Sequence, residues 1–363
     1  MKTITSGRVY IIAEAGVNHN GSFDMAKELI DVAANAGADA VKFQTFRADR
    51  LVSGAAPKAE YQARTTDVAE TQHAMLTKLE LNEAAHRELI AHSRQRGVQF
   101  LSTPFDLESV DLLADTFDLP CLKLSSGEIT NAPLLLKASA TGKPAILSTG
   151  MSTLTEIETA LGVLAFGYLR RDAAPSIAAF HDAYRSPEGQ QALREKVTLL
   201  HCTTEYPAPF AEVNLRAMDT MAAAFGLPVG FSDHTEGIAV PIAAVARGAT
   251  VIEKHFTLDR TLPGPDHKAS LEPDDLRAMV RSIRQVEEAL GSARKLPSPS
   301  ESKNMDVARK SIVAARDISK GEPFSAENLA TKRPGTGLSP LLYWALLGRP
   351  AGRNYAKDEM VEL

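Results

Sequence analysis

The chain has 363 residues, more than a single hydrophobic core usually spans, so one large domain and one small domain are expected. Apolar residues make up 44% and charged residues 23%, as in ordinary soluble globular proteins, and the net charge of -5 argues against a nucleic-acid partner. Without a run of ~20 apolar residues or a signal-peptide pattern, the chain is expected in the cytoplasm, away from membranes, with Cys121 and Cys202 as buried free thiols.

The first 290 residues predict an alternation of short apolar strands and helices. The strands are expected at 9–13, 40–44, 98–102, 121–124, 145–147, 197–200, 227–231 and 249–252. The helices are expected at 24–36, 82–96, 107–117, 134–140, 155–166, 238–248 and 274–290. This alternation favours an α/β fold, a (β/α)8 TIM barrel over residues 1–290, with a doubly wound open sheet as the competing fold.

Other stretches depart from this alternation. Residues 47–78 form a polar excursion that is too long for an ordinary connection, so a functional role is expected. Residues 170–196 mix proline, serine and charges and predict an irregular insertion. Residues 291–305 are expected to be a linker, and residues 306–363, broken by glycine and proline, a small and mostly β domain.

Polar side chains gather where the expected barrel strands end, which is the face where barrels carry their chemistry. They are Glu14, Lys42, Gln44, Thr103, Lys123, Ser126, Glu128, Ser148, His201, Ser232, His234 and His255. Two lysines and several hydroxyls suit a small anionic substrate that bears phosphate or carboxylate groups. Taken singly, each lysine is as often a surface ion pair as a ligand.

His234 and His255 are separated by one strand–helix–strand unit, which can direct both rings into one pocket and hold a divalent metal. A lone histidine is more often structural, so only the matched pair supports this hypothesis. His201 can equally be a packed rim histidine, and Glu253 and Lys254 can simply pair across the barrel wall.

Eight segments, in this order, together resemble the bacterial N-acetylneuraminate (sialic acid) synthases. They are Ile12-Ala-Glu-Ala-Gly-Val-Asn-His-Asn-Gly21, Val41-Lys-Phe-Gln-Thr45, Ser102-Thr-Pro104, Lys123-Leu-Ser-Ser-Gly-Glu128, Ser148-Thr-Gly-Met151, Ser232-Asp-His-Thr235, Glu253-Lys-His-Phe256 and Pro263-Gly-Pro-Asp-His267. The likeness extends to Lys332-Arg-Pro-Gly335, which resembles the antifreeze-like (SAF) domain of that family.

The resemblance implies condensation of phosphoenolpyruvate with N-acetylmannosamine to N-acetylneuraminate and phosphate, with cleavage of a C–O bond. It also implies Mn²⁺ or Mg²⁺ on His234 and His255, no organic cofactor, and a catalytic Glu14 that stabilises a cation or handles a proton of water. Synthases of legionaminic acid and, less closely, pseudaminic acid are the alternatives; these accept 2,4-diacetamido-2,4,6-trideoxyhexoses.

The same resemblance assigns the substrate contacts. Those implied for phosphoenolpyruvate are Lys42, Thr103, Lys123, Ser126, Ser148 and Ser232, and those for the sugar are Gln44, Glu128, Tyr206, Asp266 and Arg333. Arg333 would come from the small domain of the other subunit in a domain-swapped homodimer. Two departures are the length of 170–196 and Thr204, where some relatives carry asparagine.

Two other classes of protein compete with this interpretation. One is a barrel aldolase with Lys123 as the Schiff-base lysine. The other is a sugar- or ice-binding protein, which only the antifreeze-like tail suggests.

Overall fold

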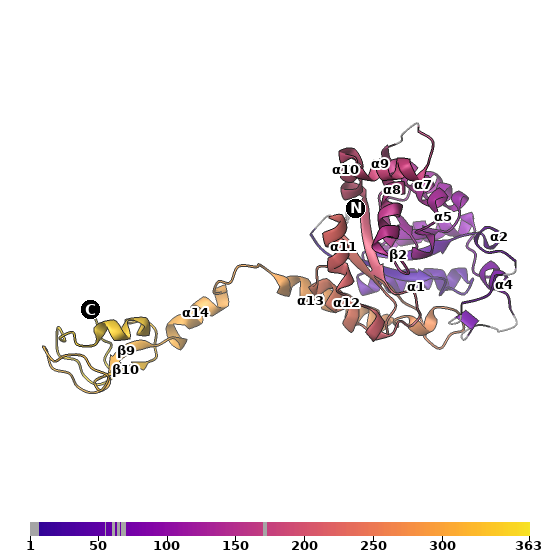
Figure 1. Cartoon of the computed structure of the whole chain (residues 1–363). Helices are drawn as coiled ribbons and strands as arrows, with labels where there is room; N and C mark the ends of the chain where they lie inside the picture. Colours follow the sequence, from indigo (N-terminus) through magenta and orange to yellow (C-terminus); the bar gives the residue numbers. More distant parts are fainter. Residues whose placement is uncertain (1–6, 55, 60–61, 64–65, 67–69, 170–172) are drawn as a thin grey trace. The chain divides into compact units, whose positions relative to one another are not determined.

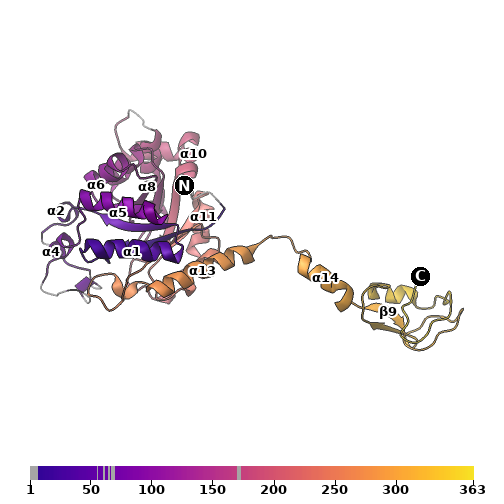
Figure 2. The ribbon, with the colours of Figure 1, turned by 180° about the vertical axis from the view of Figure 1, so that it is seen from behind.

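The computed structural model describes residues 7–54, 56–59, 62–63, 66, 70–169 and 173–363. The chain divides into two compact units, Met1–Gly291 and Ser292–Leu363 (Figures 1 and 2). Both cysteines are buried and free. In the described part of the chain, no helix has the length and apolarity needed to span a membrane.

The first unit is built on an eight-stranded parallel sheet, in which β1 pairs with β8 as well as with β2. Its strands are β1 (Tyr10–Gly16), β2 (Ala40–Thr45), β3 (Gln99–Pro104), β4 (Leu122–Leu124), β5 (Ala145–Ser148), β6 (Val197–Cys202), β7 (Val229–Asp233) and β8 (Val251–His255). β3 and β4 lie side by side and complete the ring. The predicted TIM barrel is confirmed, and the open sheet is excluded.

Helices follow most strands and surround the sheet. They are α1 (Phe23–Ala36), α2 (Ala48–Leu51), α4 (Gln72–Thr77), α5 (Glu83–Arg96), α6 (Leu107–Asp111), α7 (Ala132–Ala140), α8 (Leu154–Leu169), α9 (Ile177–Arg185), α10 (Pro187–Lys196), α11 (Ala217–Phe225), α12 (Ala239–Ala246) and α13 (Pro273–Leu290). Side chains such as Asn82 cap their first turns, and Gly37 and Gly97 end α1 and α5 in the left-handed conformation.

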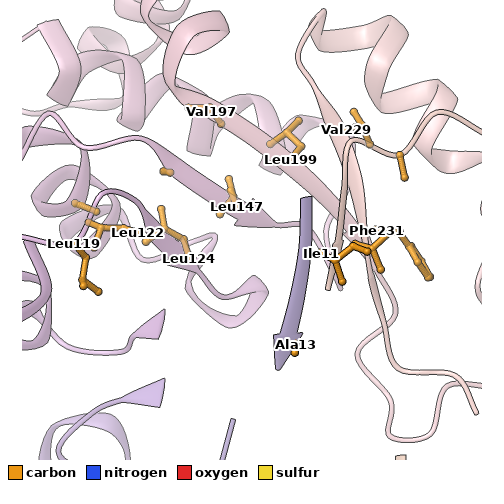
Figure 3. Packing of buried hydrophobic residues seen from close by; sticks show 14 of the residues in the cluster. Ile11, Ala13, Leu119, Leu122, Leu124, Leu147, Val197, Leu199, Val229 and Phe231 are labelled. Carbon is orange, nitrogen blue, oxygen red and sulfur yellow. The ribbon is translucent and has the colours of Figure 1, made fainter. Parts of the chain in front are cut away.

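Strand side chains alternate between two cores. Outward-facing residues such as Ile11, Leu147 and Phe231 pack against the helices (Figure 3). Inward-facing residues fill the barrel; they are Tyr10, Ile12, Ala40, Leu101, Cys121, Ile146, Leu200 and Val251. On β7 the inward position is Gly230, where a Cβ atom would lie 2.4 Å from the Val251 carbonyl oxygen. Glycine is therefore required there for the strands to close on one another.

The structure differs from the predicted elements in several places of this unit. α11 lies between β6 and β7, where no helix is predicted, and α2 and α4 lie in the polar excursion. The segment after 172, expected to be irregular, forms α9 and α10, because Ser176 and Ser186 are N-caps and Pro187 occupies a first helical turn. Residues 170–172 lie outside the described residues. The helix expected at 107–117 is α6 followed by a π-helical turn, Leu112–Thr116.

The second unit has its own small core. Its antiparallel strands are β9 (Ser311–Ala314) and β10 (Leu329–Lys332), and a short helix, α15 (Tyr343–Leu346), packs with them. Part of the predicted linker is helical: α14 (Pro299–Ala308) begins with a capping box of Ser298 and Glu301. This helix was not predicted, because serine and proline are common both in loops and at the starts of helices.

Candidate active site

A cavity of about 280 Å³ lies at the carboxyl ends of the barrel strands. Each strand contributes at least one inward-facing side chain, which lies two residues beyond the residue that the strand contributes to the barrel interior. They are Glu14, Lys42, Gln44, Thr103, Lys123, Ser148, Cys202, Ser232, Glu253 and His255. The two-residue period of a strand explains this arrangement, since the apolar barrel interior lies directly below these residues.

A larger cavity, of about 630 Å³, lies at the opposite ends of the strands. Tyr10, Gln99, Cys121 and Thr250 belong to its lining, which is mainly apolar. We assign the chemistry to the smaller cavity because catalytic groups of barrels lie at the carboxyl ends of the strands.

Four buried charges form the floor of the smaller cavity. Lys42 Nζ lies 2.8 Å from Glu14 Oε2 and 3.6 Å from Glu253 Oε2, and Lys123 Nζ lies 3.4 Å from Glu253 Oε1. Each of these side chains is at most 5% exposed. Two ammonium groups therefore compensate two carboxylates, which makes their burial tolerable.

Hydroxyl groups complete this network. Lys42 donates to Thr103 Oγ1 at 3.0 Å, and Lys123 donates to Ser148 Oγ at 2.8 Å. Ser232 Oγ donates to Glu253 Oε1 at 2.9 Å. The floor thus presents cations and hydroxyl groups side by side, an arrangement that suits a phosphate or carboxylate.

The two carboxyl groups differ in acidity. Burial raises the pKa of Glu14 to about 7, and the negative charge of Glu253 adds to this although Lys42 opposes it. Burial would also raise the pKa of Glu253, but Lys123 and Lys42 outweigh it and lower that pKa to about 2. Near neutral pH, Glu14 can therefore exchange a proton while Glu253 stays ionised.

His234 and His255 meet at the edge of this floor, with ring centroids 5.5 Å apart. His234 Nδ1 lies 2.6 Å from the Thr203 carbonyl oxygen, which can only accept, so Nδ1 carries the proton and Nε2 keeps its lone pair. Burial lowers the pKa of His234 to about 4 and that of His255 well below its usual value. Both rings are neutral at pH 7.

These rings fit a divalent metal. His255 Nδ1 is buried without a hydrogen-bond partner and lies 3.7 Å from Asp266 Oδ2, while burial raises the pKa of Asp266 to about 6. Neutral imidazoles are the form that binds metals, and an orphaned buried nitrogen needs such a partner. The described residues contain no group of three or more His, Cys, Asp or Glu side chains arranged as ligands. The protein would supply two nitrogen ligands and leave the remaining positions to oxygen.

Most of the predicted site residues line this one cavity. They are Glu14, Lys42, Gln44, Thr103, Lys123, Ser126, Ser148, Tyr206, Ser232, His234, His255 and Asp266. Glu128 does not line it, because the turn Ser126–Glu128 carries its carboxylate to Asn131, which donates to Oε2 at 2.6 Å. Arg333 belongs to the second unit, where its Nε donates to the Ala308 carbonyl oxygen.

Sequence reasoning missed Glu253, whose expected role was a possible pair with Lys254. Lys254 instead binds Asp233 outside the barrel, at 2.7 Å, and Glu253 faces the cavity. The two-residue period gives the signal, because His255 and Glu253 must share a face of β8. By the same rule His201 faces outward, where its Nε2 bonds the Val213 carbonyl oxygen at 2.6 Å.

Comparison with known proteins identifies the family. The profile of the NeuB family matches residues 29–295, and that of the SAF domain matches residues 309–362. N,N'-diacetyllegionaminic acid synthase of Campylobacter jejuni is 52% identical over 98% of this chain and 99% of its own length. The synthase of the same name from Legionella pneumophila is 46% identical over 91% of this chain and 87% of its own.

A solved structure adds a third relative. The N-acetylneuraminic acid (sialic acid) synthetase of Leptospira borgpetersenii superposes with a TM-score of 0.64 at 32% identity, covering 82% of this chain and 90% of that one. The main expectation of N-acetylneuraminate synthesis from N-acetylmannosamine is wrong on these comparisons, since the relatives at 52% and 46% identity are both legionaminic acid synthases.

The family assignment also removes the aldolase and the sugar- or ice-binding protein from consideration. With matches that span nearly the whole chain, this protein belongs to the NeuB family, carries a C-terminal SAF domain, and is an enzyme of the sialic acid synthase type.

Proposed function

We propose that this protein condenses phosphoenolpyruvate with 2,4-diacetamido-2,4,6-trideoxymannose to give N,N'-diacetyllegionaminic acid and phosphate. The observation that carries the proposal is the 52% identity to a synthase of that name, over nearly all of both chains. The floor of the cavity supports it, because its cations, hydroxyl groups and paired imidazoles suit an enol phosphate and an aldehyde.

Lys42 and Lys123 would bind the anionic groups of phosphoenolpyruvate, and Thr103, Ser126, Ser148 and Ser232 would donate hydrogen bonds to it. The two ammonium groups already stand beside hydroxyl groups at 3.0 and 2.8 Å, so little reorganisation is needed on binding. Gln44, Tyr206 and Asp266 would contact the sugar.

Mn²⁺ or Mg²⁺, held by His234 and His255, would act as a Lewis acid toward the open-chain sugar aldehyde. Tyr206 packs on both rings, with its centroid 4.1 Å from that of His234 and 5.5 Å from that of His255, and would fix their orientation. No organic cofactor is required by this chemistry.

The bond changes follow from the two substrates. C3 of phosphoenolpyruvate attacks the aldehyde carbon, whose oxygen becomes an alkoxide, and cationic character develops at C2. The alkoxide becomes a hydroxyl group by taking up the proton that water loses in the next step. Water adds at C2, and the resulting tetrahedral intermediate expels phosphate by breaking its C–O bond. Glu14 would take the proton of that water, since a carboxyl group with a pKa of about 7 can accept and return a proton at neutral pH.

We further propose a cytoplasmic homodimer in which the second unit contacts a partner subunit. Its support is the exposed apolar surface of that unit, where Leu341 is 86% and Trp344 76% exposed, together with the exposed Arg333. Arg333 would reach the sugar from the partner. A monomeric mass in sedimentation equilibrium would contradict the dimer.

The function is tested by phosphate release from phosphoenolpyruvate with three hexoses: 2,4-diacetamido-2,4,6-trideoxymannose, its altrose isomer and N-acetylmannosamine. We expect the first to give the highest kcat/KM and EDTA to abolish its turnover. An equal or higher kcat/KM for N-acetylmannosamine or the altrose isomer would contradict the proposed substrate.

A further inference from the structure

The cavity has two unlike sides, and the proposed chemistry uses only its charged floor. A second part of its lining is an apolar wall, defined by Leu51, Val52, Met75, Leu76, Leu79 and Phe105. Four of these six residues lie in the long excursion, residues 47–78, for which the sequence predicts a functional role, and Leu79 follows it directly. None of the six has a part in the bond changes.

The apolar wall is held in place by packing and hydrogen bonding within the barrel unit. Its two short helices, α2 and α4, contact each other and lie together in both views of the molecule (Figures 1 and 2). Met75, Leu76 and Leu79 pack with Phe46 in one buried cluster. A bond of 2.7 Å between His73 Nε2 and Asp49 Oδ1 joins α2 to α4.

The six side chains of the wall are apolar and offer no cation to a substrate. Among the described residues that line the cavity, the ammonium groups are those of Lys42 and Lys123, both engaged on the floor, and no arginine is present. The polar groups that the excursion adds are the neutral amides of Gln62 and Gln72. A phosphate at this side would find no charged partner among the lining residues that the structure describes.

The position of the aldehyde fixes which end of the sugar meets the wall. C1 must lie on the floor, beside the imidazoles and phosphoenolpyruvate, so the remote carbon C6 is directed away from the floor. We propose that the apolar wall receives C6 and makes the enzyme specific for a hexose whose remote end is an uncharged methyl group. This inference rests on the proposed function and adds to it the group that is discriminated.

The size of the effect follows from desolvation. A hydroxyl group on C6 that lies against the six apolar side chains would lose its water without gaining a partner from them, while the nearby amides of Gln62 and Gln72 already bond each other at 3.2 Å. This penalty corresponds to about 10- to 100-fold in kcat/KM. A doubly charged phosphate on C6 would be rejected more strongly, because a buried charge without a partner costs far more than a hydroxyl group.

The test uses two hexoses that differ only at C6: 2,4-diacetamido-2,4,6-trideoxymannose and 2,4-diacetamido-2,4-dideoxymannose, which keeps the 6-hydroxyl. We expect the wild type to prefer the 6-deoxy sugar by about 10- to 100-fold in kcat/KM. Val52→Thr, which keeps the side-chain shape, and Leu51→Asn should each reduce that ratio by at least about fivefold. The KM for phosphoenolpyruvate should stay unchanged.

Leu107→Asn, at an exposed leucine on α6 outside the cavity, is the matched control and should leave the ratio as in the wild type. A wild-type ratio below about two, with both sugars turned over, would overturn the inference, as would an unchanged ratio in both wall variants. Absence of turnover with either sugar in the wild type would contradict the proposed function itself, and the inference with it.

Discussion

Glu253 illustrates how a buried charge is kept in this site. Its carboxylate lies 3.6 Å from Lys42 and 3.4 Å from Lys123, and it accepts a hydrogen bond from Ser232. Because all of these groups are buried, the removal of one charge leaves the others without compensation. The stability of the barrel and the binding of phosphoenolpyruvate therefore depend on the same residue.

Glu253→Gln should destabilise the metal-free barrel unit by about 3 kcal/mol, because two buried ammonium groups would then share the single carboxylate of Glu14. Urea denaturation followed through the transition of that unit measures the loss. Glu108→Gln, which breaks an exposed ion pair with Arg50, is the control and should cost less than ~1 kcal/mol. A loss for Glu253→Gln as small as that of the control would show that the charges are not coupled.

At the scale of elements, β7 and β8 bring the two imidazoles together, and a second ion pair joins these strands on their outer side. Asp233 and Lys254 are paired in register, bond at 2.7 Å and are fully buried, and Lys254 also donates to the Thr235 carbonyl oxygen. Each partner is the direct neighbour of a histidine. The pair therefore fixes the spacing of His234 and His255.

Lys254→Met should weaken Mn²⁺ binding about tenfold and destabilise the barrel, because Asp233 is left buried and unpaired. Electron paramagnetic resonance titration measures the affinity. The double variant Lys254→Met with Asp233→Leu should regain stability to within ~1 kcal/mol but keep the weakened binding, since the cross-link is absent. Unchanged Mn²⁺ affinity in both variants would restrict the pair to a structural role.

The strands and the site positions on them could be predicted from the sequence, because a short apolar run that ends in polar residues is typical of a buried barrel strand. Glu253 was not predicted as a site residue, because an ion pair with its neighbour Lys254 was a sufficient explanation for its charge. The two-residue period of β8 places it on the same inward face as His255. Ser186-Pro187 starts helix α10, but its composition is also typical of a loop. Local composition does not distinguish a helix cap from a turn. The sequence did not predict which part of the cavity the excursion lines, because that depends on the tertiary packing of its side chains.

At the scale of the whole molecule, the barrel separates its two tasks along its axis. An apolar interior stabilises the ring of strands, and the next inward-facing positions collect the ionisable groups at one end. The apolar interior thus carries no formal charge, while the buried charges at one end serve both binding and the stability of the barrel.

We propose that a divalent metal on His234 and His255 acts next to the lysine-lined floor of the cavity. The most direct measurement is phosphate release by EDTA-stripped enzyme, titrated with Mn²⁺, for the wild type and for His255→Ala. We predict that Mn²⁺ restores turnover of the wild type and that the variant stays at least ~100-fold slower, because the Lewis acid contributes several kcal/mol. Turnover of the stripped wild type without added metal, or a variant as fast as the wild type, would contradict the account.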